Sequence, residues 1–165
     1  MKVSKDENQK KTDNLKTHSQ LLLELWQEAR TRLTNQLTEL TTEDLKKTLS
    51  PSPNSVGFLL RHIAEVELLF AKNVFKAPGI TVHAATLIAK HDTGEWNNLT
   101  ALKDFLGYAF ESLKEIIELQ TEDYWEQSVT TVEFGIKTRA EALGRIASHT
   151  AYHSGQLAMV LKYGK

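Results

Sequence analysis

The chain contains no cysteine among its 165 residues. This absence excludes disulfides, a cysteine nucleophile and thiolate metal sites, and it leaves histidine and carboxylate as the strong metal ligands. It is consistent with a reducing compartment, and we expect a soluble protein in the cytoplasm. Any chemistry that needs a thiol would have to use a diffusible one.

The chain also lacks an excess of either charge, since 20 basic and 21 acidic residues give a formal net charge of -1. No basic cluster or arm stands out, so neither nucleic acid nor an anionic membrane surface is favoured as a partner. No run reaches the about 18 apolar residues that a membrane helix needs. Residues 1–14 are charged and polar, which is unlike a secretory signal or an anchor.

The length and a hydrophobic content of 41% are ordinary for one globular domain. Charge without periodicity in residues 1–14 predicts a flexible lead-in, and we assign residues 15–165 to a single domain.

Apolar residues recur at spacings of three and four in four long segments, near residues 17–40, 55–75, 100–119 and 139–162. Either Asn54 or Ser55 can cap the second segment, and Thr138 with Glu141 forms a capping box before the last. A short helix is expected over residues 41–47, a long crossover over 80–98 in which 80–90 could be helical, and a short extended segment at most over 129–135. The pattern predicts an all-α fold, a four-helix bundle with a long crossover connection.

Three histidines lie on the apolar stripes of two of these helices. His149 and His153 are four residues apart, so they share one face of the last helix at a separation of about 6 Å along its axis. His62 lies at the centre of the stripe of the second helix. We therefore predict that the three imidazoles converge on one metal ion. His18, His83 and His91 lack such a partner and are interpreted as structural or surface residues.

The residues around these histidines resemble the DinB-like (DinB/YfiT-like) family of metal-binding four-helix bundles. Residues 54–65, NSVGFLLRHIAE, look like the family's first motif, and residues 149–156, HTAYHSGQ, look like its second. The resemblance implies that His62, His149 and His153 bind a divalent ion, zinc or nickel, and that the metal activates a low-molecular-weight thiol for transfer. One position departs from the family, which often has arginine after the last histidine, whereas this chain has Ser154.

Three imidazoles leave a fourth tetrahedral position for water or a thiolate, as in catalytic sites. Glu65 could orient a ligand imidazole or accept a proton, but a solvated glutamate on the helix surface is the simpler explanation of its position. Gln156 could donate to a ligand or a bound water, but a polar residue at the edge of the stripe needs no site to explain it.

The sequence leaves several functions open. The first is a metal-dependent transferase that uses a thiol and acts on a small-molecule substrate, with a hydrolase as its nearest variant. The second is a non-catalytic, metal-stabilised bundle that acts as a dimeric stress or interaction protein; in either case we expect a homodimer. A di-iron site of the hemerythrin type is disfavoured because the extra carboxylate ligands have no recognisable positions.

Overall fold

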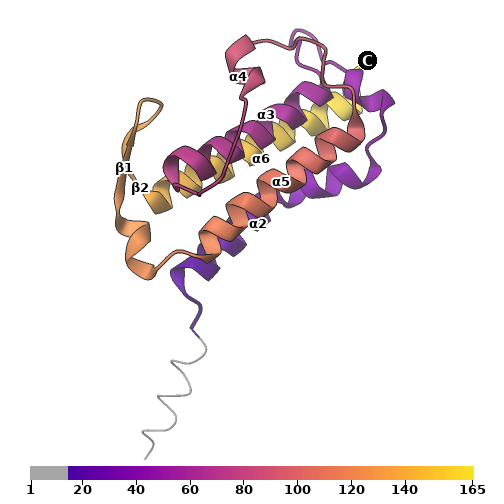
Figure 1. Cartoon of the computed structure of the whole chain (residues 1–165). Coiled ribbons are helices and arrows are strands. Elements are labelled where there is room, and N and C mark those ends of the chain that lie inside the picture. The colour runs from indigo at the N-terminus through magenta and orange to yellow at the C-terminus, as the bar shows by residue number, and fades with distance from the viewer. Residues whose placement is uncertain (1–14) are drawn as a thin grey trace, which may run out of the picture.

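A computed structural model describes residues 15–165, so the predicted lead-in over residues 1–14 lies outside the described part of the chain. Its body is built of four long helices: α2 (His18–Glu39), α3 (Val56–Leu69), α5 (Leu99–Glu118) and α6 (Arg139–Tyr163). In Figure 1, α3 and α6 lie side by side, and α5 runs along them with α2 behind it. The predicted all-α bundle is confirmed.

The helices begin at the side chains that the sequence indicates. Ser55 Oγ accepts a hydrogen bond from the amide of Phe58 and caps α3. Thr138 and Glu141 form the predicted capping box of α6, in which each side chain accepts from the backbone amide of the other residue. These bonds satisfy amides that would otherwise lack partners at the first turn, so they fix the start of both helices that carry the histidines.

Three shorter helical elements lie between α2 and α5. A 3₁₀ turn, η1 (Glu43–Lys46), occupies the segment predicted as a short helix. Helix α3 continues into a π-helical turn, η2 (Phe70–Val74), so the predicted extent to about residue 75 holds with a changed hydrogen-bond pattern. The crossover then contains α4 (Ala85–Ala89), which stands outside the bundle above α3 in Figure 1.

The crossover returns along the first turn of α3, where Gly57 allows a very close approach. A Cβ atom at this position would lie 1.9 Å from the carbonyl oxygen of Trp96, so only glycine fits. The carboxylate of Asp92 also accepts a hydrogen bond of 2.8 Å from the amide of Ser55. The crossover is therefore attached to α3 at its N-terminus.

A β-hairpin precedes α6, where the sequence predicted one extended segment at most. The 3₁₀ turn η3 (Glu122–Glu126) leads into β1 (Ser128–Thr131) and β2 (Gly135–Thr138), which pair antiparallel with Thr131 opposite Gly135. The chain reverses at Gly135, whose φ of 71° suits glycine. Because no residue of β2 is fully buried, its periodicity gave no signal of a second strand.

A buried ion pair joins all four long helices. Arg30 of α2 donates through Nε to Glu67 of α3 at 3.0 Å and through Nη2 to the carbonyl of Leu106 in α5 at 3.1 Å. Thr150 of α6 donates to the same carboxylate at 3.0 Å. The guanidinium also lies 4.9 Å from the ring centroid of Phe110. Every charge in this network is thus paired inside the core.

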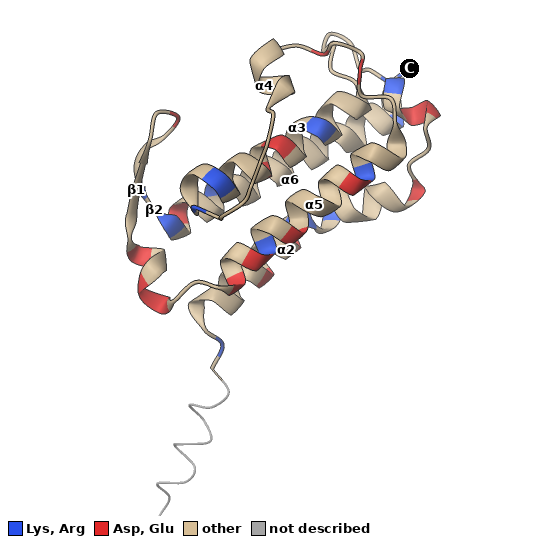
Figure 2. Ribbon diagram, viewed as in Figure 1, with Lys and Arg blue, Asp and Glu red and all other residues tan. Residues whose placement is uncertain are grey.

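Within residues 15–165, none of the helices combines the length and the apolar character that crossing a membrane requires. Both Lys or Arg and Asp or Glu occur along the visible helices in Figure 2, in keeping with the balanced charge of the sequence.

We predict that Glu67→Ala lowers the free energy of unfolding by about 3–5 kcal/mol, because Arg30 would be left buried without its counter-ion. Urea denaturation at pH 7 measures the change. Glu24→Ala is the matched control, since Glu24 pairs with Lys16 on the surface and its loss should cost less than about 1 kcal/mol. Similar small losses in both variants would contradict a structural role for the buried pair.

Candidate metal centre

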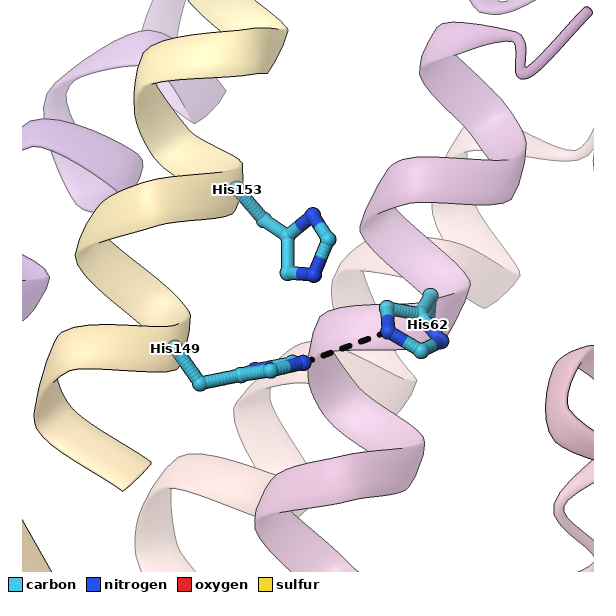
Figure 3. Close-up of side chains that lie close together, drawn as sticks. All are labelled: His62, His149 and His153. Atoms are coloured by element: carbon cyan, nitrogen blue, oxygen red, sulfur yellow. Dashed lines mark hydrogen bonds between the residues drawn. The ribbon is translucent and has the colours of Figure 1, made fainter. Parts of the chain in front are cut away.

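The three histidines come together in the space between α3 and α6. His62 projects from α3, and His149 and His153 project from successive turns of α6 (Figure 3). Each histidine offers one ring nitrogen as a ligand atom, and these three nitrogens all lie within 4.8 Å of one another. All three side chains are half-buried. The structure therefore brings together the three residues that the sequence singled out.

The spacing of the nitrogens is close to that of ligands around one ion. His62 Nε2 and His149 Nε2 are 3.2 Å apart. Two imidazole ligands at ~2.0–2.1 Å from a tetrahedral zinc ion would lie about 3.3 Å from each other.

Hydrogen bonds fix which nitrogen of His62 carries the proton. Thr86 donates its hydroxyl hydrogen to the carboxylate of Glu65, so Thr86 Oγ1 can only accept from His62 Nδ1, which lies 3.1 Å away. His62 Nδ1 is consequently protonated, and its Nε2 presents a bare lone pair. An imidazole whose other nitrogen donates to a fixed acceptor is oriented for metal binding.

Glu65 is fully buried, which corrects the alternative of a solvated surface glutamate. Its carboxylate accepts from the amides of Ala85 and Thr86 at 3.0 and 2.9 Å, and from Arg61 Nε at 2.7 Å. Glu65 thus attaches α4 to α3 and acts on His62 through Thr86. The sequence gave no sign of Thr86, because a threonine in a crossover of uncertain structure has no spacing that relates it to His62.

The second polar residue weighed from the sequence, Gln156, lies against His153. Its amide nitrogen donates to the hydroxyl of Tyr152 at 3.1 Å, which turns its carbonyl oxygen towards His153 Nδ1 at 2.6 Å. His153 Nδ1 is therefore the protonated nitrogen, and Nε2 is the bare one. Gln156 accepts from the imidazole, so it orients the ring rather than donating to a ligand or a water.

The environment keeps all three imidazoles neutral. Burial, and then repulsion from His153, lowers the pKa of His62 to about 4. Burial lowers the pKa of His149 to about 3, with further contributions from His153, His62 and Arg145. Burial also lowers the pKa of His153, while its hydrogen bond to Gln156 opposes the change. Two neutral rings with a bare Nε2, those of His62 and His153, and the neutral ring of His149 beside them form a donor set that a divalent cation can use, so these residues fit such an ion.

His62 and His149 border a cleft beneath the β-hairpin, which we call the hairpin cleft. A cavity of about 470 Å³ is lined by His62 and His149, and an adjoining one of about 490 Å³ is lined by His149, Arg145 and Tyr152. Residues shared by the two cavities are Val66, Phe70, Glu133 and His149. A small molecule that enters this cleft would therefore contact His62 and His149, whereas His153 lines neither cavity.

Ser154 does not face the three histidines. Its side chain is fully buried and donates a hydrogen bond of 2.6 Å to the carbonyl of Thr150 within α6. Its own carbonyl accepts from Gln36 of α2 at 3.1 Å. The residue after the last histidine thus belongs to the packing of α2 on α6.

The remaining histidines lie apart from the cluster. His18 pairs with Glu122 at the surface, and His83 and His91 are exposed. Among the described residues, the cluster of His, Asp and Glu that is compact enough for an ion contains no carboxylate. This composition weighs against the di-iron alternative, which needs bridging carboxylates.

Comparison with known families gives one match. A family model described as the DinB superfamily matches residues 25–157, a range that includes all three histidines and all four long helices except the ends of α2 and α6. No curated protein matches the chain.

The lowered pKa values predict a loss of stability in acid for the metal-free protein. An unfolded histidine titrates near about 6.5, so between that pH and about 4 the unfolded chain binds protons that the folded cluster excludes. The free energy of unfolding should therefore fall as pH drops from about 6.5, and these groups should have no effect above it. Urea denaturation of chelator-treated protein between about pH 7.5 and 5 measures the slope, and His149→Gln should make it shallower. An identical slope in that variant would show that His149 does not have a lowered pKa.

Proposed function

This chain belongs to the DinB superfamily, and on that premise we propose that His62, His149 and His153 bind one divalent metal ion for a reaction in the hairpin cleft. The observation that supports this most directly is the convergence of neutral imidazoles, two of them held with Nε2 bare, beside a cleft of small-molecule size. Zinc or nickel is the metal we propose, although imidazole also suits copper and iron.

The reaction we propose is the transfer of a low-molecular-weight thiol to a small electrophile. A divalent ion held by three protein ligands would make a thiol or a water more acidic and so supply a nucleophile at neutral pH. Three protein ligands leave a coordination position free, which is typical of catalytic sites and not of sealed structural ones. Because the chain has no cysteine, the thiol would come from solution.

The protein's own residues supply orientation and partial exclusion of water. Thr86 and Gln156 hold two of the rings with Nε2 towards the cluster. Phe134 at the hairpin tip packs towards Phe70 of η2, with ring centroids 6.0 Å apart, and this contact helps to hold the hairpin over the cleft. A cleft that the hairpin partly covers but that a small molecule can enter favours a catalytic role over a purely stabilising metal. Cytoplasmic location and a homodimer complete the proposal.

We predict that the metal-free protein takes up one equivalent of zinc or nickel and that His153→Ala binds it at least about 100-fold more weakly, because one of three donors is lost. Competition titration with a chromophoric chelator gives the stoichiometry and the affinity. His91→Ala is the matched control, since His91 is exposed and lies outside the cluster. Wild-type affinity in His153→Ala would exclude that residue as a ligand.

The same titration distinguishes a ligand from a residue that orients one. Thr86→Val keeps the shape and the backbone amide that Glu65 accepts from, but removes the hydroxyl that accepts from His62 Nδ1. Affinity should fall by about 10- to 100-fold, and Thr86→Ser should restore most of it. Equal affinities for Thr86→Val and Thr86→Ser would show that the hydroxyl does not orient His62.

Transfer is tested by incubating the metal-loaded protein with a panel of low-molecular-weight thiols and an aryl halide whose thioether product absorbs light. We expect product formation that depends on the thiol and is lost in His149→Ala but retained in His91→Ala. Consumption of an activated ester without thiol would instead indicate a hydrolase. Rates at background level in all proteins, with every thiol, would favour the non-catalytic bundle.

A further inference from the structure

Arg145 is placed where it can bind a ligand in the hairpin cleft. It lies on α6 four residues before His149, so the two side chains lie on the same face of the helix. Both line the same cavity, and the positive charge of Arg145 contributes to lowering the pKa of His149. Among the described residues that line the two cavities, Arg145 is the only cation.

The present partner of Arg145 is a residue that a ligand could replace. Arg145 Nε and Nη2 both lie 3.1 Å from Glu133 Oε1, and the two side chains are 44% and 60% exposed. An ion pair this exposed contributes little to stability because water screens it. Glu141, one turn earlier on α6, does not compete for Arg145 since its carboxylate accepts from the amide of Thr138 in the capping box.

The wall beside this pair is mostly apolar. Leu69, Phe70, Val132 and Phe134 line the cavity that also contains His62 and His149. A ligand that matches this apolar wall and the single arginine has an apolar body and one small negative group near the guanidinium. A planar carboxylate matches the fork of a single guanidinium in two parallel hydrogen bonds. A phosphate dianion would need more positive charge than one arginine beside Glu133 supplies.

We propose that Arg145 is the anchor for the carboxylate of a small molecule bound in the hairpin cleft, and that Glu133 is the counter-ion which this carboxylate replaces. The inference deepens the proposed function and rests on it for the identity of the ligand, which is the thiol or its electrophilic acceptor. Binding at Arg145 itself needs neither turnover nor metal.

The test compares two matched probes, hydrocinnamate and its uncharged amide, by ligand-observed NMR with the full-length chain after treatment with chelator. Wild type should bind the carboxylate about three- to tenfold more tightly than the amide, and the difference should shrink as salt is added. Arg145→Gln should abolish the preference. Glu133→Gln should instead strengthen carboxylate binding about two- to fivefold, because the competing carboxylate is removed.

Arg145→Gln and Glu133→Gln should change carboxylate binding in opposite directions. A general loss of structure would weaken binding in both variants, so the two explanations can be separated. Arg32→Gln, which removes an exposed arginine of α2 outside the cleft, controls for net charge and should leave the preference unchanged. A second arm titrates metal-loaded protein with mercaptopropionate and mercaptopropionamide. If the preference for mercaptopropionate over its amide is lost in Arg145→Gln, the anchored carboxylate belongs to the thiol. If only the preference for hydrocinnamate is lost, it belongs to the acceptor.

Two results would overturn the proposal. One is equal affinity of wild type for hydrocinnamate and its amide, including the absence of binding by both. The other is a preference for the carboxylate that survives in Arg145→Gln. Since the hydrocinnamate arm uses metal-free protein, its failure is distinct from a failure of metal binding or of thiol transfer.

Discussion

The buried ion pair between Arg30 and Glu67 is the interaction on which the rest of the structure depends. A paired charge in a core is tolerated only if its remaining hydrogen-bonding groups are satisfied, and here the partners come from each of the other long helices. Thr150, which completes the pair from α6, stands between His149 and His153 in the sequence. Glu67 follows His62 on α3. The network that neutralises one buried arginine therefore also links α3 to α6, the two helices that carry the histidines.

The helices and the three histidines could be predicted from the sequence because both depend on local periodicity. Capping residues such as Ser55 and Thr138 act on amides within their own first turn, so they are visible in a few residues of sequence. A histidine on an apolar stripe likewise shows its direction without knowledge of the partner helix. These signals placed His62, His149 and His153 before any tertiary contact was known.

The supporting residues could not be predicted because their roles arise from tertiary contacts. Glu65 is buried because the crossover covers it, and its position on α3 alone does not indicate this. Thr86, which contacts His62, lies 24 positions away in the sequence. The sequence predicts only one extended segment where the structure has the hairpin over the cleft. The second strand gives no signal because no residue of β2 is fully buried. The place of Arg145 in the cleft likewise depends on where the hairpin lies, so its sequence position carries no sign of it.

The central claim is that three neutral imidazoles form the protein's share of one metal site. X-ray absorption spectroscopy at the edge of the bound zinc or nickel tests this most directly, because it reports the atoms around the ion irrespective of catalysis. We expect three imidazole nitrogens near ~2.0–2.1 Å with at least one further light ligand, and a loss of one imidazole in His149→Ala. A coordination shell without imidazole scattering, or a spectrum unchanged in that variant, would contradict the account.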